Sequence, residues 1–247
     1  MNEYVSLPRV FLKDTFQDEK KITLQGYKSH HLLKVIKVKI NDKILIFNGV
    51  DGEWLGIISK VSRSAVEISL SYRLRPQDKL VPLVLLFSPV KKKLTNLIIQ
   101  KATELGVTEI WPVITERTNL SEINLDRLYI TSIGAAEQSR RLSLPLIKEP
   151  IDLLSSLEGW VNEAPMYVAD KSFQSDPISN FFLTKENFDN LGVGFFIGPE
   201  GGLSDSELET LLSHSFVKKI FLGPRILRSE TASIAVLSIW QAAYGDW

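Results

Sequence analysis

The spacing of hydrophobic and polar residues divides the chain into two parts with different periodicities. In residues 1–72, apolar side chains alternate with polar ones over short segments such as 66–70, which is typical of half-buried strands. Residue pairs that favour tight turns separate these segments: Asn-Asp at 41–42, Asn-Gly at 48–49 and Asp-Gly at 51–52. We therefore expect a small antiparallel β-barrel or sandwich in the N-terminal part.

One segment of this part has a helical pattern instead. Residues 30–38, HHLLKVIKV, predict a short helix whose inward face carries Leu32, Val35 and Ile36. The two adjacent histidines at its start diverge by about 100° on a helix, which makes them a poor metal site. We expect no metal site in this protein.

The pattern changes after the polar segment 71–80, SYRLRPQDKL, which contains a proline. Residues 81–87, VPLVLLF, form an uninterrupted apolar run, as in a strand buried on both faces of a parallel sheet. Residues 91–106 then repeat apolar positions at helical spacing and end in Gly106, a residue suited to a helix C-terminus. We place a domain boundary at residue 72, so that the domains span residues 1–72 and 73–247.

Strands and helices continue to alternate through the rest of the chain. The predicted strands are 107–114, 165–170, 192–198 and 217–223, and the predicted helices are Leu125–Ala136, a helix from Ser204 and a last helix to about Tyr244. The segment 170–190 has no regular pattern. This alternation predicts an α/β fold with a mostly parallel sheet and helices on both of its faces.

The amino-acid composition indicates more about the cellular location of the protein than about its function. Lys and Arg number 29, and so do Asp and Glu, so any nucleic-acid surface must be a local patch. The absence of cysteine excludes disulfides, thiolate metal sites and a cysteine nucleophile. The first residues do not have the pattern of a signal peptide, and no apolar run approaches the ~20 residues of a membrane helix. We expect a cytoplasmic protein without membrane association.

Two loops with the same plan carry the candidate chemistry. Each follows a predicted strand, opens with Gly-Pro and leads into a helix, in FFIGPEGGLSDSE from Phe195 and in FLGPRILRSETA from Phe221. The glycines permit close approach of the backbone to a ligand, and loops at the carboxyl ends of parallel strands are where α/β proteins bind ligands. A tight strand-to-helix connection without a ligand is the alternative interpretation of either loop alone.

Helix-start signals fix the position of both loops. Ser204 with Glu207 has the spacing of a capping box, and Ser229 is the expected N-cap of the last helix. The first loop does not have the residues of a nucleotide-phosphate motif: Leu203 follows the glycines where a P-loop needs lysine, and Ile197 stands where a dinucleotide motif needs glycine. A neutral heterocycle therefore suits the two loops better than a triphosphate.

The two loop motifs resemble the C-terminal signature of the 16S rRNA uracil-N3 methyltransferase family, which belongs to the SPOUT superfamily. The similarity extends along most of the chain, through PRVFL, HHLLKVIKVKINDKI, IIQKATELGVTEIWPV, ERT and AAEQSRRLSLPLI. One position departs from the family pattern, because Arg140 stands where the family usually has glycine. This replacement puts the local backbone geometry and any contact of residue 140 in question.

The resemblance implies a fold, a cofactor and partners. It implies a PUA-like RNA-binding β-barrel domain followed by a SPOUT domain with a C-terminal trefoil knot. S-adenosylmethionine is the implied cofactor, a homodimer the implied assembly, and 16S rRNA or the small ribosomal subunit the implied substrate. The residues expected to bind the cofactor are Ile197, Gly198, Glu200, Gly202, Leu222, Gly223, Ile226, Leu227, Arg228 and Thr231.

The implied reaction moves a methyl group to N3 of a uridine, whose proton must leave. A cation near the uracil oxygens stabilises the anion that forms, and we assign this catalytic role to Arg228. Glu200 either accepts the proton or complements the positive charge of the cofactor. An ion pair with Glu230 or the capping of a helix is the alternative role for Arg228. Bracing of the turn is the alternative role for Glu200.

Basic residues distributed along the chain are the candidates for contacts to RNA phosphates. They are Arg9, Lys34, Lys37, Lys91, Lys92, Lys93, Lys101, Arg140 and Arg141. Two other functions remain open: a non-catalytic RNA-binding protein with the same fold, and a SPOUT methyltransferase that acts on another RNA base.

Overall fold

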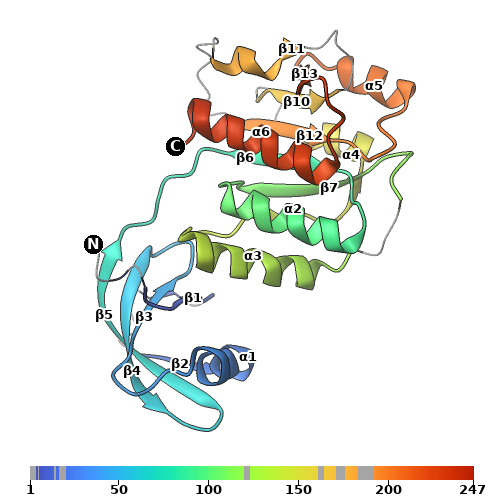
Figure 1. Ribbon diagram of the computed structural model, residues 1–247. Helices are drawn as coiled ribbons and strands as arrows, with labels where there is room; N and C mark the ends of the chain where they lie inside the picture. Colours follow the sequence, from blue (N-terminus) through green and yellow to red (C-terminus); the bar gives the residue numbers. More distant parts are fainter. Residues whose placement is uncertain are drawn as a thin grey trace. The chain divides into compact units, whose positions relative to one another are not determined.

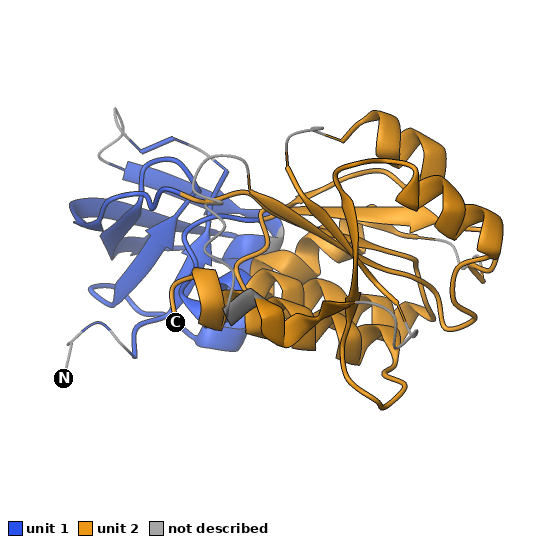
Figure 2. Ribbon diagram, turned by 90° about the horizontal axis from the view of Figure 1, so that it is seen from above, with its two compact units in different colours: residues 1–79, 136–144 blue, residues 80–135, 145–247 orange. Residues whose placement is uncertain are grey.

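The computed structural model describes residues 4, 6–13, 15–16, 21–119, 123–160, 164–170, 176–182 and 192–247. The chain forms two compact units, of which the first comprises Met1–Lys79 with Ala136–Leu144 and the second the remaining residues (Figure 2). The predicted boundary at residue 72 falls inside a strand, and a later segment joins the N-terminal unit. Membership of a unit follows contacts between distant residues, which a local hydrophobic pattern does not report.

The first unit is built on a five-stranded sheet in the order β1-β3-β4-β5-β2 (Figure 1). Strand β1 is parallel to β3, whereas the other pairs are antiparallel. Backbone angles in the left-handed region occur at the predicted turns, with φ of 72° at Asn41, 85° at Gly49 and 81° at Gly52. The strands are β1 (Arg9–Phe11), β2 (Lys21–Gln25), β3 (Lys43–Phe47), β4 (Glu53–Val61) and β5 (Ala65–Arg75).

The helical segment of this unit differs from its prediction in one respect. A short helix α1 (Gly26–His30) continues into a π-helical turn, η1 (His31–Ile36). Leu32 is buried as expected, but Val35 is 65% exposed, so its predicted inward position is wrong. A π-helical turn has more residues than an α-helical turn, and the inward positions therefore shift.

The second unit contains an eight-stranded sheet in which every pair of neighbouring strands is parallel. The order is β11-β13-β10-β12-β6-β7-β8, with β9 beside β7. The predicted α/β fold with a mostly parallel sheet is confirmed. The strands are β6 (Leu83–Phe87), β7 (Glu109–Ile114), β8 (Leu146–Ile147), β9 (Ile151–Asp152), β10 (Met166–Ala169), β11 (Asp176–Pro177), β12 (Val193–Ile197) and β13 (Val217–Phe221).

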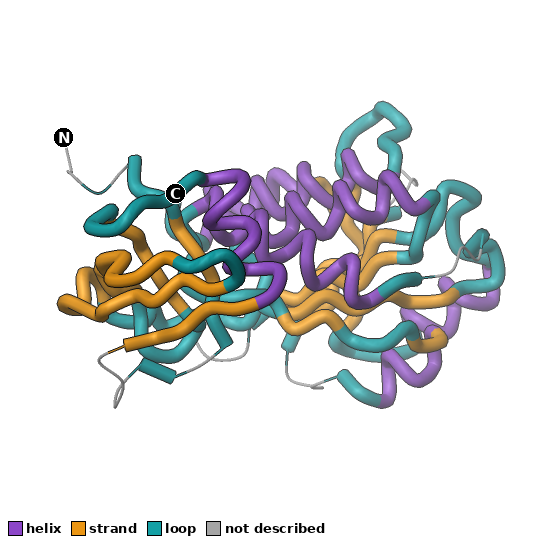
Figure 3. Tube along the Cα trace, turned by 90° about the horizontal axis from the view of Figure 1, so that it is seen from below, coloured by secondary structure: helices purple, strands orange, loops and turns teal. Residues whose placement is uncertain are grey.

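Helices cover both faces of this sheet (Figures 1 and 3). Residues of α2, α3 and α6 share one hydrophobic core with alternate residues of β6 and β12, whereas α4 and α5 share the core on the other face. Strand β6 shows the cause, since Leu85 belongs to the first core and Leu86 to the second. The helices are α2 (Lys92–Glu104), α3 (Leu125–Ser139), α4 (Leu153–Glu158), α5 (Asp205–Leu212), α6 (Ser229–Tyr244) and the 3₁₀ helix η2 (Ile178–Phe182).

Two predictions concern the irregular segment 170–190 and the absence of a membrane helix. In the segment 170–190, residues 171–175 and 183–190 lie outside the described residues, and the described part forms β11 and η2. Across the described ranges, no helix combines the length and apolarity needed to span a bilayer.

Candidate active site

A cavity of about 510 Å³ lies at the carboxyl-terminal edge of the parallel sheet in the second unit. Because the strands are parallel, the segments that follow β7, β10, β12 and β13 all end at this edge. Each of these segments contributes to the wall, so the two Gly-Pro loops do lie together. The lining residues are Arg117, Val168–Asp170, Ile197–Leu203, Leu208, Phe221–Leu227, Ser229 and Ala232.

The loop after β12 is tightly folded. Its Gly202 has φ +72° and donates its N–H to the carbonyl of Pro199 at 2.8 Å, which closes a turn. The predicted capping box is present, because Ser204 Oγ accepts from the Glu207 N–H at 3.2 Å and the Glu207 carboxylate accepts from the Ser204 N–H at 2.9 Å. Helix α5 therefore begins at a fixed point at the end of this loop.

The loop after β13 is more open. Gly223 has φ +103°, and Arg225 and Ile226 are exposed, Ile226 by 82%. Ser229 was the expected N-cap of α6, but this prediction is wrong: the N-cap is Arg228, and Ser229 lies within the helix. The Ser229 hydroxyl instead donates to the carbonyl of Gly198 at 3.2 Å, which joins the end of this loop to the start of the other.

Most of the residues expected at the cofactor line the cavity. Arg228 and Thr231 do not; both are exposed, Arg228 as the N-cap of α6 and Thr231 in its first turn. The expected residues that line the cavity are Ile197, Gly198, Glu200, Gly202, Leu222, Gly223, Ile226 and Leu227.

Sequence reasoning missed two charged residues of the wall. Asp170 directly follows β10, and its carboxylate lies 3.6 Å from Lys219 Nζ. Arg117 follows β7, in the ERT segment that supported the family resemblance, and donates to backbone carbonyls of the first loop. Their position after parallel strands was the signal available in the sequence, but the order of the strands in the sheet was not.

The cavity suits S-adenosylmethionine in size and chemistry. Its volume lies within the ~300–1,000 Å³ of ligand pockets. Leu222, Ile226 and Leu227 offer an apolar wall, and Glu200 with Asp170 places two carboxylates where a cationic ligand is expected. Gly198 lies close to Leu203, since a Cβ at Gly198 would be 3.4 Å from Leu203 Cγ.

The structure corrects one predicted RNA contact, Arg9. Its side chain is only 5% exposed and pairs with Glu53 at 2.7 Å. It also donates to the carbonyls of Ala136 and Arg141, at 2.8 and 3.0 Å, and lies over the Phe47 ring at 4.4 Å. Burial lowers the pKa of this guanidinium, and the charge of Glu53 opposes that shift. Arg9 stabilises the first unit rather than facing a phosphate.

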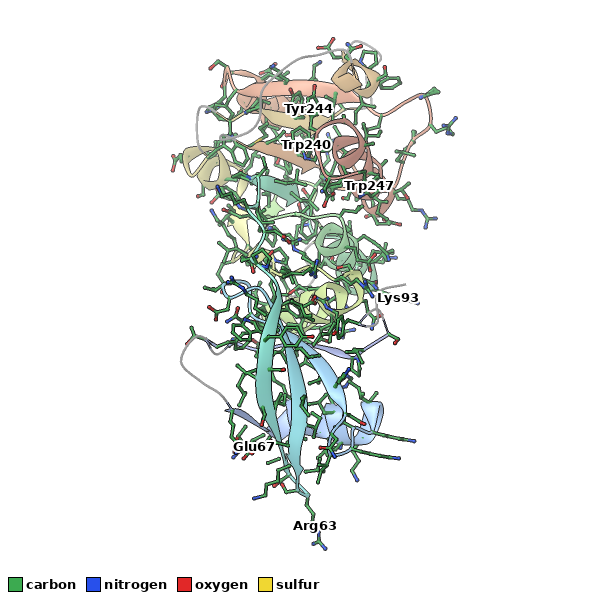
Figure 4. All side chains as sticks on the ribbon, turned by 90° about the vertical axis from the view of Figure 1, so that its left-hand side faces the viewer. Arg63, Glu67, Lys93, Trp240, Tyr244 and Trp247 are labelled. Atoms are coloured by element: carbon green, nitrogen blue, oxygen red, sulfur yellow. The ribbon has the colours of Figure 1, made fainter. Side chains whose placement is uncertain are left out.

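The other predicted RNA-binding residues differ in exposure. Burial lowers the pKa of Arg141 to about 10, and its Nε donates to Ser143 Oγ at 3.3 Å. Arg140 is exposed with φ +63°, a left-handed geometry that glycine adopts more readily than arginine. The remaining residues are exposed: Lys34, Lys37, Lys91, Lys92 and Lys93, the last of which projects from α2 in Figure 4, whereas Lys101 is half-buried.

The two units carry opposite net charges, although the net charge of the whole chain is zero. The first contains 16 Lys and Arg against 10 Asp and Glu, and the second 13 against 19. The net charges are therefore +6 and −6, so a basic surface is concentrated in the N-terminal unit. Within the described residues, His, Asp and Glu do not gather in a group of three or more that could hold a metal ion.

Comparison with known proteins agrees with both units. Residues 76–241 match the family described as RNA methyltransferase domain, and residues 24–71 match the RNA methyltransferase PUA domain. The ribosomal RNA small subunit methyltransferase E of Rickettsia conorii is 32% identical over 231 residues, which cover 93% of each chain.

Solved structures have the same fold. The ribosomal RNA small subunit methyltransferase E of Neisseria gonorrhoeae, bound to S-adenosylmethionine, superposes with a TM-score of 0.86 at 25% identity and covers 98% of this chain and 99% of its own. A Legionella pneumophila protein solved with SAM as bound cofactor gives a TM-score of 0.85 at 26% identity, over 97% and 98% of the two chains. The resemblance found in the sequence motifs is confirmed, and the chain belongs to the RNA methyltransferase family, with an N-terminal PUA-like domain.

Proposed function

We propose that this chain transfers a methyl group from S-adenosylmethionine to N3 of a uridine in the RNA of the small ribosomal subunit. The observation that carries the proposal is the cavity that the two Gly-Pro loops enclose in the second unit. Further support comes from relatives named ribosomal RNA small subunit methyltransferase E, with which the chain aligns over more than nine-tenths of its length.

Different residues of the cavity wall are proposed to bind different parts of the cofactor. Leu222, Ile226 and Leu227 would hold the adenine, because their aliphatic side chains exclude water from its faces. The carboxylate of Asp170 would complement the positive charge of the cofactor. When bound, the cofactor supplies an activated methyl group, so the protein's main task is to align donor and acceptor in a dry site.

The uracil that accepts the methyl group needs more activation by the protein than the cofactor that donates it. N3 of uracil carries a proton and lies on the pairing edge, so the base must be unpaired when it reacts. We propose that Arg228, exposed directly after the lining residue Leu227, stabilises negative charge on the uracil oxygens. Glu200, which lines the cavity, is the proposed acceptor of the N3 proton.

We propose the trefoil knot and the homodimer of the family for this chain as well. The course of the backbone supports the knot: β10 separates β12 from β13, yet Ser229 after β13 bonds to Gly198 after β12. The chain must therefore cross back over the edge of the sheet between these points. The homodimer and the cytoplasm, where ribosomal RNA is modified, follow from the resemblance alone.

Labelled S-adenosylmethionine tests the reaction directly. The protein is incubated with 16S rRNA and with small-subunit particles, and the modified nucleotide is mapped. We expect label on N3 of one uridine, and its loss in Arg228→Ala without a matching loss of cofactor affinity. Label on another base would assign another target, and cofactor binding without label on either substrate would favour an RNA-binding protein.

A further inference from the structure

We infer that Arg117 and Glu207 are positioning residues that hold the loop after β12 in the shape required to bind the cofactor. The inference rests on the proposed use of S-adenosylmethionine and assigns a role to the ERT segment, Glu116–Thr118. Both residues act on the backbone of the stretch Gly201–Ser204, whose first three residues line the cavity.

Arg117 holds two carbonyl groups of that stretch with one nitrogen. Its Nη1 donates to the carbonyls of Gly201 and Leu203, both at 3.1 Å. These carbonyls lie in an irregular loop, where strand pairing does not satisfy them. A charged donor that bridges both fixes their relative orientation as well as their position.

Glu207 completes the connection from the opposite direction. One carboxylate oxygen accepts from the Ser204 N–H at 2.9 Å, as in any capping box. The other accepts from the N–H of Glu116 at 2.7 Å, a residue 91 positions earlier in the chain. The bond from Ser204 is buried and the bond from Glu116 is partly buried, since Glu207 is 8% and Ser204 7% exposed whereas Glu116 is exposed. One side chain thus ties the cap of α5 to the segment after β7.

The segment after β7 is a firm support for this connection. The Thr115 N–H donates to Thr118 Oγ1 at 2.8 Å, and the Thr118 N–H donates to the Thr115 carbonyl at 3.0 Å, so the four residues form a closed turn. Thr115 is 6% exposed, and β7 pairs with β6 in the interior of the sheet. The loop that binds the cofactor is therefore attached to a rigid strand other than its own.

A preorganised loop matters because binding a ligand to a disordered loop costs the entropy of ordering it. The connection by Arg117 and Glu207 orders Gly201–Ser204 before the cofactor arrives. Loss of this connection should weaken cofactor binding and increase local opening of the loop. Glu207 does not line the cavity, so its replacement has this effect without removing a group of the wall, whereas Arg117 also lines the cavity.

The first test uses Arg117→Ala in the full-length protein. We expect the Kd for S-adenosylmethionine, measured by calorimetry, to rise about tenfold, which corresponds to about 1.4 kcal/mol. Without cofactor, hydrogen exchange should become faster at the amides of residues 201–207 and stay unchanged in β12. Arg63→Ala is the matched control, because Arg63 is exposed at the tip of the β4–β5 hairpin, in the other unit (Figure 4).

The second test uses Glu207→Gln, which keeps the shape of the side chain but replaces one of its two acceptor oxygens by an amide NH₂ group. The side chain can then no longer accept the hydrogen bonds from Ser204 and Glu116 with full strength. We expect the same two changes, with the KM for cofactor raised more than kcat is lowered. Glu209→Gln is its control, since Glu209 is exposed on the same helix and loses the same charge. If Arg117→Ala does not fold, Arg117→Lys serves, with an intermediate effect expected.

The outcomes separate this inference from the proposed function. Unchanged exchange and unchanged Kd in the Arg117 and Glu207 variants, relative to their controls, would overturn the positioning role. If the wild-type protein binds cofactor but labels no RNA, the proposed reaction is contradicted. The cofactor Kd and hydrogen exchange of the variants then still decide whether Arg117 and Glu207 position the loop. If the wild type binds no cofactor, hydrogen exchange alone decides it.

Discussion

The two loops that enclose the cavity have the same sequence plan, but they differ in how firmly hydrogen bonds hold them. The loop after β12 is held by its own turn, by the α5 capping box and by Arg117 from the segment after β7. In the loop after β13, no hydrogen bond links residues 222–227 to any other part of the chain that the structure describes. The comparison teaches that a Gly-Pro motif predicts where a loop starts but not how firmly it is held.

This difference suggests a division of labour at the site. A rigid loop provides a preformed wall, whereas an open loop provides apolar side chains that a ligand can cover. Ile226 is the most exposed large hydrophobic residue in the described part of the chain, at 82%. Exposure of such a side chain beside a cavity is expected if a ligand buries it.

The largest effect should come from straining the rigid loop. Gly202→Val places a β-branched residue at φ +72°, which we expect to cost about 2 kcal/mol or more and to raise the cofactor Kd at least about thirtyfold. Calorimetry and thermal unfolding measure the two quantities. Gly202→Asn, which tolerates the left-handed region better, should retain most of the affinity. Equal losses in both variants would mean that strain is not the cause.

A test of the open loop gives the next largest effect. Ile226→Ala should raise the cofactor Kd about tenfold, because binding would bury an aliphatic side chain worth up to about 2 kcal/mol. Its free energy of unfolding should remain within about 0.5 kcal/mol of wild type, since the side chain is exposed without ligand. Val50→Ala, at 66% exposure in the first unit, is the control. Destabilisation without a change in Kd would contradict the assignment.

The bond between the two loops is the subject of a third, smaller effect. Ser229→Ala removes the donor to the Gly198 carbonyl and should lower the free energy of unfolding by about 1 kcal/mol. Denaturant unfolding measures it, with Ser238→Ala on the same helix as control. If cofactor affinity falls while stability does not, the bond serves the site rather than the fold.

The smallest effect checks the role of left-handed backbone outside the site. Arg140 occupies φ +63° in the first unit, a backbone conformation that favours glycine. Arg140→Gly removes a left-handed penalty of about 1–2 kcal/mol but adds unfolded-state entropy of about 1 kcal/mol, for a net stabilisation of about 0.5 kcal/mol. A rise in the denaturation midpoint measures it. A loss of RNA affinity in the same variant would assign a contact to the Arg140 side chain.

Much of the fold could be predicted because its signals are local. The apolar run at β6, the capping box at Ser204 and the glycine that ends α2 each depend on a few neighbouring residues. The pattern missed β8 and β9, which have two residues each and exist only by pairing with β7. A strand of two residues has too few positions to form a periodic signal.

Eight of the ten residues predicted to bind the cofactor line the cavity, which also has two charged lining residues that the sequence did not predict. Glycines and aliphatic residues of the two loops were found because a motif contains them together. Arg117 and Asp170 lie in segments that are distant in sequence, and only the order of the strands brings them to the cavity. Arg9 was misassigned because a basic residue in a sequence does not reveal its partners, here Glu53 and three backbone carbonyls.

The sequence alone determined the alternation of strands and helices, the two Gly-Pro loops and the family, because each depends on residues that are close along the chain. The tertiary structure decided which strands are neighbours, which arginines are buried and which loop is rigid. These depend on contacts between residues far apart in sequence, and the free energy of such contacts belongs to the folded chain rather than to any local segment.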